Sequence, residues 1–230
     1  MLLSQLTSAL PTILERTPGD PDIISVEHDS RRVKPGTLFV ARRGGAVDGH
    51  HFIAEAISKG AAAVVVEKEI GEIKGNEKAR AFPSFPSFPV VQVPDSAEAL
   101  AWLCATFHKF PARKMVMIGV TGTDGKTTAC SLIHSILKAA GFKVGLITTV
   151  SAVIGDQLFD TGLHTTTPDA PDVQRYLAQM VEAGMTHCVL ETTSHGLAQD
   201  RVTACEFDVA VVTNITHEHL DFHGSLDNYR

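Results

Sequence analysis

Residues 115–128 read Met-Val-Met-Ile-Gly-Val-Thr-Gly-Thr-Asp-Gly-Lys-Thr-Thr, and this stretch decides the fold. The apolar run from Met115 to Val120 predicts a fully buried strand. Gly122 and Gly125 permit a tight turn with backbone angles that other residues avoid. A helix is predicted from Lys126 onward, because apolar residues recur at steps of three and four. These residues are Ala129, Leu132, Ile133, Ile136, Leu137 and Ala140.

A strand, a glycine turn and a helix that opens with Lys-Thr form the architecture of a phosphate-binding loop. Backbone N–H groups of the turn and of the helix N-terminus attract phosphate oxygens. In such a loop Lys126 reaches the β- and γ-phosphates of a nucleotide, and the Thr127 hydroxyl binds Mg²⁺. The glycine spacing departs from the common pattern, since five residues rather than four separate Gly119 from Gly125. The alternative is a glycine turn followed by Lys-Thr by chance.

The composition is that of an ordinary globular protein. The chain has 230 residues, 44% hydrophobic and 20% charged, which suggests one large or two modest domains. A net charge of −6 argues against a general nucleic-acid binder. The four cysteines form no Cys-x-x-Cys pair and are typical of reduced thiols. With neither a signal peptide nor a membrane-spanning apolar run, we expect a cytoplasmic monomer that contacts no nucleic acid and no membrane.

Strands alternate with helices along the chain, which predicts an α/β protein. An N-terminal α/β domain is expected over residues 1–112, with Pro111–Lys114 as the hinge. A central domain with a parallel sheet is expected over residues 113–230. Residues 67–89 include the repeat Phe-Pro-Ser-Phe-Pro-Ser-Phe-Pro, in which proline excludes a regular helix. We expect an extended loop there, and the alternative is a proline-rich docking segment.

Polar residues follow three strands of the second domain. In parallel sheets, ligands bind at the carboxyl ends of the strands, which would gather 121–127, 191–195 and 214–219 around one crevice. Glu191 could hold Mg²⁺ beside the phosphate loop; the alternative is a solvated acid at a strand end. The segment His217-Glu218-His219, with His223 nearby, leaves a zinc site as a weaker alternative.

Several motifs together resemble those of the Mur ligases. In the second domain these are Gly-Thr-Asp-Gly-Lys-Thr-Thr (122–128), Thr-Thr-Pro-Asp (166–169), Glu-Thr-Thr-Ser-His-Gly-Leu-Ala-Gln-Asp-Arg (191–201) and Thr-Asn-Ile-Thr-His-Glu-His-Leu-Asp-Phe-His-Gly (213–224). In the first they are Asp-Ser-Arg (29–31), Gly-Thr-Leu-Phe-Val-Ala (36–41) and Asp-Gly-His (48–50). They occur in the family's order over nearly the whole chain. The resemblance is strongest to the family's tripeptide synthetases.

The resemblance implies an ATP- and Mg²⁺-dependent amide ligase of peptidoglycan precursor synthesis. Its substrates would be UDP-MurNAc-L-Ala-D-Glu and an amino acid, diaminopimelate or lysine. ATP would phosphorylate the D-Glu side-chain carboxylate, and the amine of the incoming amino acid would then displace phosphate. The first domain would bind the UDP end of the precursor, and the central domain would bind ATP.

The resemblance also implies roles for individual residues. The expected ATP-binding residues are Gly122, Thr123, Asp124, Gly125, Lys126, Thr127 and Thr128. The expected catalytic residues are Lys126, Glu191 and His219, and the expected metal ligands are Thr127, Glu191 and His219. The expected contacts to UDP-MurNAc-dipeptide are Ser30, Gly45, Ala46, Val47, Thr165, Thr166, Thr167, Thr193, Gln199 and Arg201.

The sequence departs from the family pattern at several positions. Asp124 replaces the usual Asn, Thr193 replaces the usual Ser, and Gly45 replaces a polar residue found in some members. The sequence stops at Arg230, before the family's carbamylated lysine and its C-terminal amino-acid-binding domain. We therefore expect an incomplete chain without ligase turnover of its own. The alternatives are a non-catalytic binding module for precursor or nucleotide, and another Mur ligase or a folylpolyglutamate synthetase-like enzyme.

Overall fold

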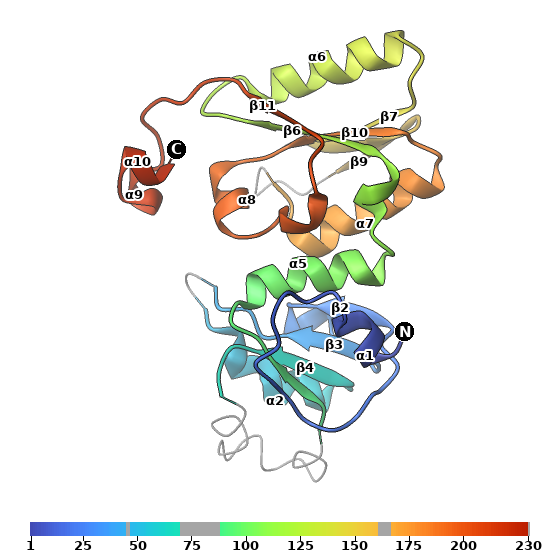
Figure 1. Cartoon of the computed structure of the whole chain (residues 1–230), viewed down its shortest axis with the longest axis vertical. Coiled ribbons are helices and arrows are strands. Elements are labelled where there is room, and N and C mark those ends of the chain that lie inside the picture. Colours follow the sequence, from blue (N-terminus) through green and yellow to red (C-terminus); the bar gives the residue numbers. More distant parts are fainter. Residues whose placement is uncertain (45–46, 70–87, 161–166, 230) are drawn as a thin grey trace. The chain divides into compact units, whose positions relative to one another are not determined.

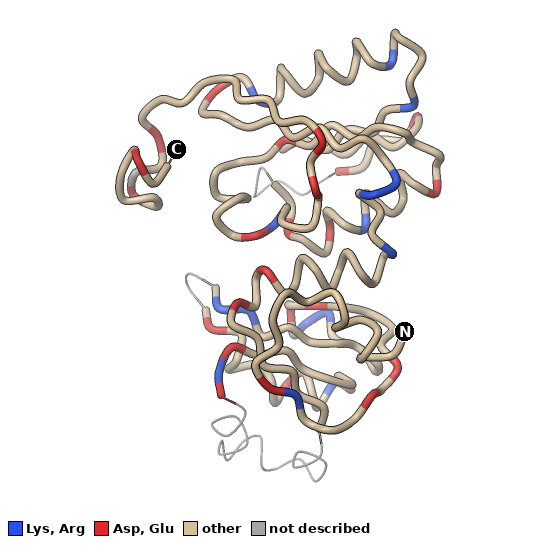
Figure 2. The backbone as a smooth tube through the Cα atoms, viewed as in Figure 1, with Lys and Arg blue, Asp and Glu red and all other residues tan. Residues whose placement is uncertain are grey.

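The computed structural model describes residues 1–44, 47–69, 88–160 and 167–229 (Figure 1). The chain divides into two compact units, Met1–Lys109 and Phe110–Arg230, which are described separately. Both contain a sheet with helices against it, so the α/β fold class is confirmed. Figure 2 shows acidic and basic residues interspersed along the backbone of both units.

The first unit is built on a five-stranded sheet in the order β1-β5-β4-β3-β2. The strands are β1 (Glu15–Arg16), β2 (Ser25–Glu27), β3 (Thr37–Val40), β4 (Ala63–Val66) and β5 (Val90–Gln92). Strands β2 to β5 are parallel, and the unexpected edge strand β1 runs antiparallel to β5. The helices are α1 (Leu3–Thr7), α2 (Ile53–Ser58) and α5 (Ser96–Phe107), with 3-10 turns η1 (Ser30–Arg32) and η2 (Gly49–Phe52).

Helix α5 begins directly after Asp95. The Asp95 carboxylate accepts hydrogen bonds from the N–H groups of Ala97 and Glu98, and so caps the helix. The 3-10 turn η2 leads directly into α2, of which Ile53–Ser58 is α-helical. Residues 70–87, which include most of the phenylalanine–proline repeat, lie outside the described residues.

The second unit contains a six-stranded sheet in the order β11-β6-β10-β7-β8-β9. The strands are β6 (Val116–Thr121), β7 (Val144–Ile147), β8 (Ser151–Ile154), β9 (Gln157–Asp160), β10 (His187–Glu191) and β11 (Val209–Val212). The first four strands in spatial order are parallel. Strands β8 and β9 form a hairpin that adds an antiparallel edge. The helices are α6 (Lys126–Ala139), α7 (Ala170–Glu182), α8 (Ser194–Ala198), α9 (Leu220–His223) and α10 (Leu226–Tyr229), with η4 (Pro111–Lys114) and η5 (Thr203–Cys205).

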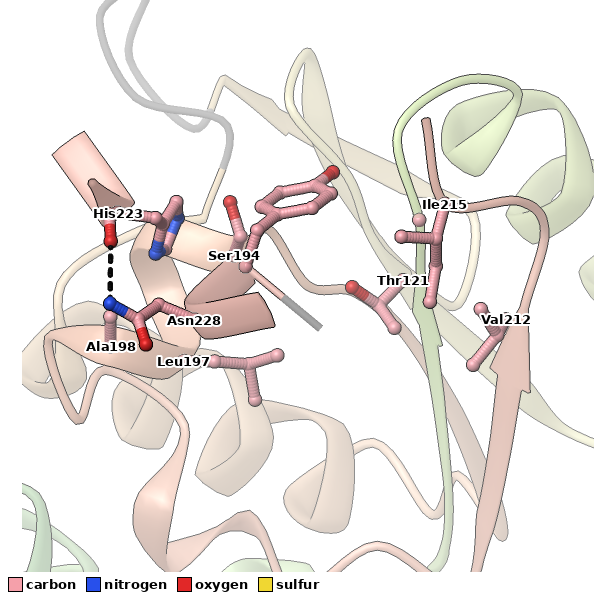
Figure 3. A pocket seen from close by; sticks show the side chains of 10 residues that line it. Thr121, Ser194, Leu197, Ala198, Val212, Ile215, His223 and Asn228 are labelled. Atoms are coloured by element: carbon pink, nitrogen blue, oxygen red, sulfur yellow. Dashed lines mark hydrogen bonds between the residues drawn. The ribbon is translucent and has the colours of Figure 1, made fainter. Parts of the chain in front are cut away.

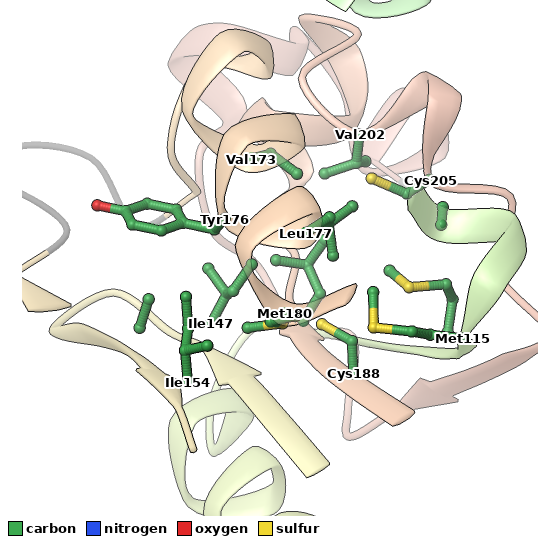
Figure 4. Packing of buried hydrophobic residues seen from close by; sticks show 14 residues of the cluster. Met115, Ile147, Ile154, Val173, Tyr176, Leu177, Met180, Cys188, Val202 and Cys205 are labelled. Atoms are coloured by element: carbon green, nitrogen blue, oxygen red, sulfur yellow. The ribbon is translucent and has the colours of Figure 1, made fainter. Parts of the chain in front are cut away.

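Helices α6 and α7 cover opposite faces of this sheet (Figure 1). Successive side chains of a strand point to opposite faces, and the two cores follow that alternation. Ile118 and Val189 pack with α6, whereas Met117 and Leu190 pack with the α7 side. Figure 4 shows the α7 core, in which the helix side chains interdigitate with those of the strands. The central strands β6, β10 and β7 are therefore buried on both faces, and polar residues lie at their ends.

The segment predicted as the hinge forms part of the second unit. Pro111–Lys114 is the 3-10 turn η4, which packs beside α7 and η5. The unit boundary lies between Lys109 and Phe110, and both of these residues have positive φ, 60° and 51°. No helix among the described residues is long and apolar enough to span a membrane.

Candidate functional site

The glycine turn after β6 has the backbone that its residues predict. Gly122 has φ +136°, and a Cβ there would lie 2.8 Å from the Asn214 carbonyl oxygen and against Thr213. Gly125, with φ +79°, caps α6, and a Cβ there would meet no atom within 4 Å. Glycine is thus required at position 122, where the turn passes close to residues 213 and 214. Gly125 has open space beside it at the helix N-terminus. That terminus carries a partial positive charge that favours anions.

The turn is held by the segment that follows β11. The Asn214 side chain spans the Asp124 peptide groups, accepting from the Asp124 N–H at 3.0 Å and donating to its carbonyl at 3.0 Å. The Thr213 hydroxyl donates to the same carbonyl at 2.6 Å. Thr123 is buried, and its hydroxyl accepts from the Thr216 N–H at 2.9 Å and lies 2.9 Å from the Tyr229 hydroxyl. The loop backbone is therefore fixed, and the exposed Asp124 carboxylate projects from it.

Lys126 is the first residue of α6, and its side chain folds back over the turn. Its ammonium donates to the carbonyls of Gly122 and Thr123, both at 2.7 Å. A cation is thus anchored above the loop by the loop's own backbone. An anion bound at the helix N-terminus would lie within reach of this charge.

Glu191 ends β10 between the loop strand β6 and β7, and it is only 1% exposed. The Thr127 hydroxyl lies 2.9 Å from each of the two carboxylate oxygens and donates to one of them. The Thr149 hydroxyl donates at 3.0 Å and the Thr149 N–H at 3.2 Å. Burial and the nearby Glu191 charge raise the pKa of the Cys130 thiol to about 12. Because the Glu191 side chain is buried, the alternative of a solvated acid at this strand end is wrong.

The surroundings of Glu191 suit a hard cation. A buried carboxylate without a cation is costly, and in the described residues no Lys, Arg or His forms an ion pair with Glu191. Mg²⁺ binds through oxygen, with one or two carboxylates completed by water and phosphate. The Glu191 carboxylate and the Thr127 hydroxyl next to the loop fit that donor set. No group of three or more His, Cys, Asp or Glu residues in the described chain could hold a metal, so nothing there supports the zinc alternative.

The third expected metal ligand, His219, contacts an aromatic cluster. Its ring packs edge-on against His195 of α8, with centroids 4.6 Å apart, and its Nε2 lies 3.9 Å from Glu218. Phe222 and His223 complete this aromatic cluster around His195. Burial and the positive potential of His219 and His223 lower the pKa of His195. The structure thus joins Thr127 and Glu191 by hydrogen bonds, whereas the contacts described for His219 are with His195 and Glu218, and its role as a metal ligand stays a prediction.

Four of the expected precursor-binding residues meet around the short helix α8, with Thr193 before it and Gln199 and Arg201 after it. The Thr167 hydroxyl lies 3.1 Å from the Thr193 hydroxyl and accepts from the Thr193 N–H at 3.0 Å. The Arg201 guanidinium donates to the Thr167 carbonyl at 2.6 Å and to Gln199 Oε1 at 2.7 Å. It also forms an ion pair with Asp169 at 3.2 Å, with the Arg201 side chain 12% exposed. Thr165 and Thr166 lie outside the described residues.

In the first unit, Ser30 opens the turn η1. Its hydroxyl donates to Glu55 at 3.2 Å, and its carbonyl accepts from Lys59 at 3.1 Å. Val47 is 55% exposed, and its carbonyl accepts from the Gly44 N–H at 3.0 Å. Gly45 and Ala46 lie outside the described residues.

Asp48 and His50 anchor the end of the 44–47 loop. His50 is buried; its Nδ1 lies 2.6 Å from Asp48, and its Nε2 accepts from the Glu67 N–H at 3.1 Å. Burial acts to raise the pKa of Asp48, but hydrogen bonds from Lys68 and His50 outweigh it and hold that pKa below its ordinary value of 3.8. Asp48 and His50 are therefore held to residues 67 and 68 by the Asp48–Lys68 ion pair as well as by the hydrogen bond from the Glu67 N–H.

We expect Asp48→Asn to reduce the free energy of unfolding at pH 7 by about 1–3 kcal/mol, the cost of losing charged hydrogen bonds. Because the folded-state pKa is lowered, the contribution is complete above 3.8 and is lost as the pH falls below it. Urea unfolding across this pH range measures the difference. Asp22→Asn, whose parent side chain is 77% exposed, is the control. A parent–variant difference that stays constant down to the most acidic pH would contradict the expectation.

A cavity of about 400 Å³ opens beside the loop (Figure 3). It lies between the ends of β6 and β11, the helix α8 and the segment from α9 to α10. Its lining residues are Thr121, Gly122, Ser194, Leu197, Ala198, Val212, Ile215, His223, Asn228 and Tyr229. Figure 3 shows Asn228 donating to the His223 carbonyl, at 3.0 Å, on the wall opposite Val212 and Ile215. The cavity extends from the phosphate loop toward α8, where Thr193 lies.

Sequence reasoning missed two residues of this site. Asn214 belongs to a quoted motif, but only the tertiary structure shows that its amide holds the phosphate loop. Thr149 belongs to no motif, and nothing in its surroundings along the chain marks it as a partner of Glu191.

The comparisons agree with the two units. A family profile described as "Mur ligase family, catalytic domain" matches residues 22–108, and one described as "Mur ligase middle domain" matches residues 120–230. A relative from Geobacillus thermodenitrificans, named UDP-N-acetylmuramoyl-L-alanyl-D-glutamate--2,6-diaminopimelate ligase, is 42% identical over 100% of this chain and 44% of its own length. A Roseiflexus relative, named UDP-N-acetylmuramyl-tripeptide synthetase, is 42% identical over 100% of this chain and 43% of its own length.

A solved structure titled as a UDP-N-acetylmuramoyl-L-alanyl-D-glutamate--2,6-diaminopimelate ligase shares the fold. Its TM-score is 0.72 at 28% identity, over 90% of this chain and 39% of that one. The present chain thus spans less than half the length of the relatives that it matches.

Proposed function

Because the chain belongs to the Mur ligase family, we propose that it is the precursor- and nucleotide-binding part of an ATP-dependent tripeptide synthetase. The reaction would add a third amino acid, diaminopimelate or lysine, to UDP-MurNAc-L-Ala-D-Glu in the cytoplasm. The observation that carries the proposal is the buried Glu191 carboxylate bound to Thr127, directly beside the loop on which Lys126 is anchored. Relatives that are 42% identical across the whole chain support this substrate.

The geometry supports a phosphoryl transfer from ATP to the D-Glu side-chain carboxylate. The α6 N-terminus and the turn from Gly122 to Gly125 would bind the phosphates, and Lys126 would stabilise the charge that develops during transfer. Mg²⁺, when bound, would offset phosphate charge at the position that Thr127 and Glu191 define. The resulting acyl phosphate is then open to attack by the amine, with phosphate as the leaving group.

The second substrate would lie at the start of α8. Thr193 and Thr167 offer hydroxyl groups, and Arg201 offers a cation for the acidic muramoyl-dipeptide. Ser30 and the 44–47 loop would receive the UDP end. We assign His219 to the metal site only as an expectation from the family resemblance, because its ring lies against His195 in this structure.

Calorimetry on the chain of residues 1–230 tests the proposal directly. We expect saturable binding of Mg²⁺-ATP and, separately, of UDP-MurNAc-L-Ala-D-Glu. UDP-MurNAc without the dipeptide should bind more weakly, because the contacts at Thr193 and Arg201 would be lost. Binding of neither ligand by a chain that is folded by circular dichroism would refute the proposal.

We expect Asp124→Asn to strengthen ATP binding in the absence of Mg²⁺. The exposed carboxylate projects from a loop that would hold phosphates, and two like charges repel by an amount that depends on the local dielectric. Asparagine keeps the shape and removes the charge, while the Asn214 contacts reach only the Asp124 backbone and should persist. Titration of ATP with Mg²⁺ and with EDTA measures the effect. If instead Mg²⁺-ATP binding alone weakens, Asp124 helps to hold the metal and the repulsion reading is wrong.

A further inference from the structure

Thr149 contacts both oxygens of the buried Glu191 carboxylate. Its hydroxyl donates to Oε1 at 3.0 Å, and its backbone N–H donates to Oε2 at 3.2 Å. It lies two residues beyond the end of β7, the strand that pairs with β10 on the side away from β6. The Glu191 carboxylate is therefore hydrogen-bonded by residues of two separate elements. These are Thr127 of α6 and Thr149 of the β7–β8 turn.

The Thr127 hydroxyl by itself cannot fix the carboxylate. It has one proton and lies 2.9 Å from each of the two oxygens, so it can donate to only one of them at a time. The two Thr149 donors are directed at different oxygens and so define the rotation of the carboxylate plane. If Thr127 turns its oxygen lone pair to a metal, Thr149 is the other described residue that orients Glu191.

We propose that Thr149 is a positioning residue that sets the orientation in which Glu191 meets the nucleotide-bound Mg²⁺. The inference rests on the proposed function, since it takes Glu191 as the metal-binding carboxylate. Groups that hydrogen-bond to metal ligands fix ligand orientation, and their loss typically costs about tenfold or more in metal affinity. In this role Thr149 acts through Glu191, at which its hydroxyl and its N–H are both directed.

The test compares Thr149→Val, which removes the hydroxyl but keeps the N–H, with Thr149→Ser, which keeps both donors. Thr186→Val is the matched control, because it makes the same change beside the opposite end of β10. There the Thr186 hydroxyl donates to the Lys143 carbonyl. Affinity for a non-hydrolysable ATP analogue is measured by calorimetry with Mg²⁺ and with EDTA. Mn²⁺ binding in the presence of the analogue is followed by electron paramagnetic resonance.

We expect Thr149→Val to weaken analogue binding about tenfold with Mg²⁺ and less than about twofold with EDTA, and to weaken Mn²⁺ binding in parallel. Thr149→Ser and Thr186→Val should match the parent. Equal loss with and without metal would overturn the positioning role, because it would reveal a general disturbance of the loop. Unchanged binding by Thr149→Val would overturn it as well.

Glu191→Gln separates this inference from the proposed function. If it removes the Mg²⁺ dependence while Thr149→Val does not, only the role of Thr149 is refuted. If neither variant changes the Mg²⁺ dependence, the metal site at Glu191 is refuted and the role of Thr149 with it. Should Thr149→Val fail to fold, Thr149→Ala is measured in its place against Thr186→Ala.

Discussion

Lys126→Ala is expected to weaken ATP binding by roughly a hundredfold, equivalent to about 2–3 kcal/mol. The ammonium would be lost from the phosphate loop, where its two carbonyl contacts hold it in place. A charge-assisted hydrogen bond to phosphate is about twice as strong as a neutral one. Calorimetric titration with ATP and Mg²⁺ measures the loss.

Lys138→Ala removes the same charge from the last turn of α6, far along the helix from the loop, and should leave ATP affinity within about twofold. Hydrogen exchange at Gly122 and Thr123 would show whether Lys126→Ala also loosens the turn. If the two variants bind ATP equally well, the loop does not bind phosphate through Lys126.

Arg201→Ala is expected to weaken binding of UDP-MurNAc-L-Ala-D-Glu by about 1–3 kcal/mol. Its guanidinium donates hydrogen bonds to the Thr167 carbonyl and to Gln199 and forms an ion pair with Asp169. The Arg201 side chain is largely buried. Removal would take away a cation and would also release the Thr167 backbone beside Thr193. Arg201→Lys should recover only part of the affinity, since an ammonium lacks the planar fork that makes these contacts.

The control for Arg201 is Arg175→Ala on α7, where the guanidinium pairs with Asp172 and is 46% exposed. ATP affinity serves as a second control, because the partners described for Arg201, namely Thr167, Gln199 and Asp169, do not belong to the phosphate loop. Calorimetry with the precursor and with ATP distinguishes the two effects. Unchanged precursor affinity in Arg201→Ala, or an equal loss for both ligands, would rule out the assignment of Arg201 to the precursor.

The sequence determined the strand, turn and helix at residues 115–139. This unit is encoded locally, because the apolar run, the two glycines and the helical period lie within a short stretch. Helix α5 and the β8–β9 hairpin are also local, since the cap and apolar stripe of α5 are adjacent and the two strands of the hairpin are consecutive. The short edge strand β1 was missed, because its two residues carry no alternation and pair with β5 across a long stretch of chain.

The sequence predicted that the polar strand ends gather at one edge of the sheet. Tertiary structure alone decided which of their side chains are hydrogen-bonded to one another. Glu191 is buried because β6 and β7 flank β10, and its partner Thr149 lies 42 positions away in sequence. Asn214 reaches the Asp124 peptide across 90 positions because β11 pairs with β6. Hydrogen bonds of this range depend on which strands become neighbours. That choice is made by the packing of the whole sheet and leaves no periodic or spacing signal around either residue.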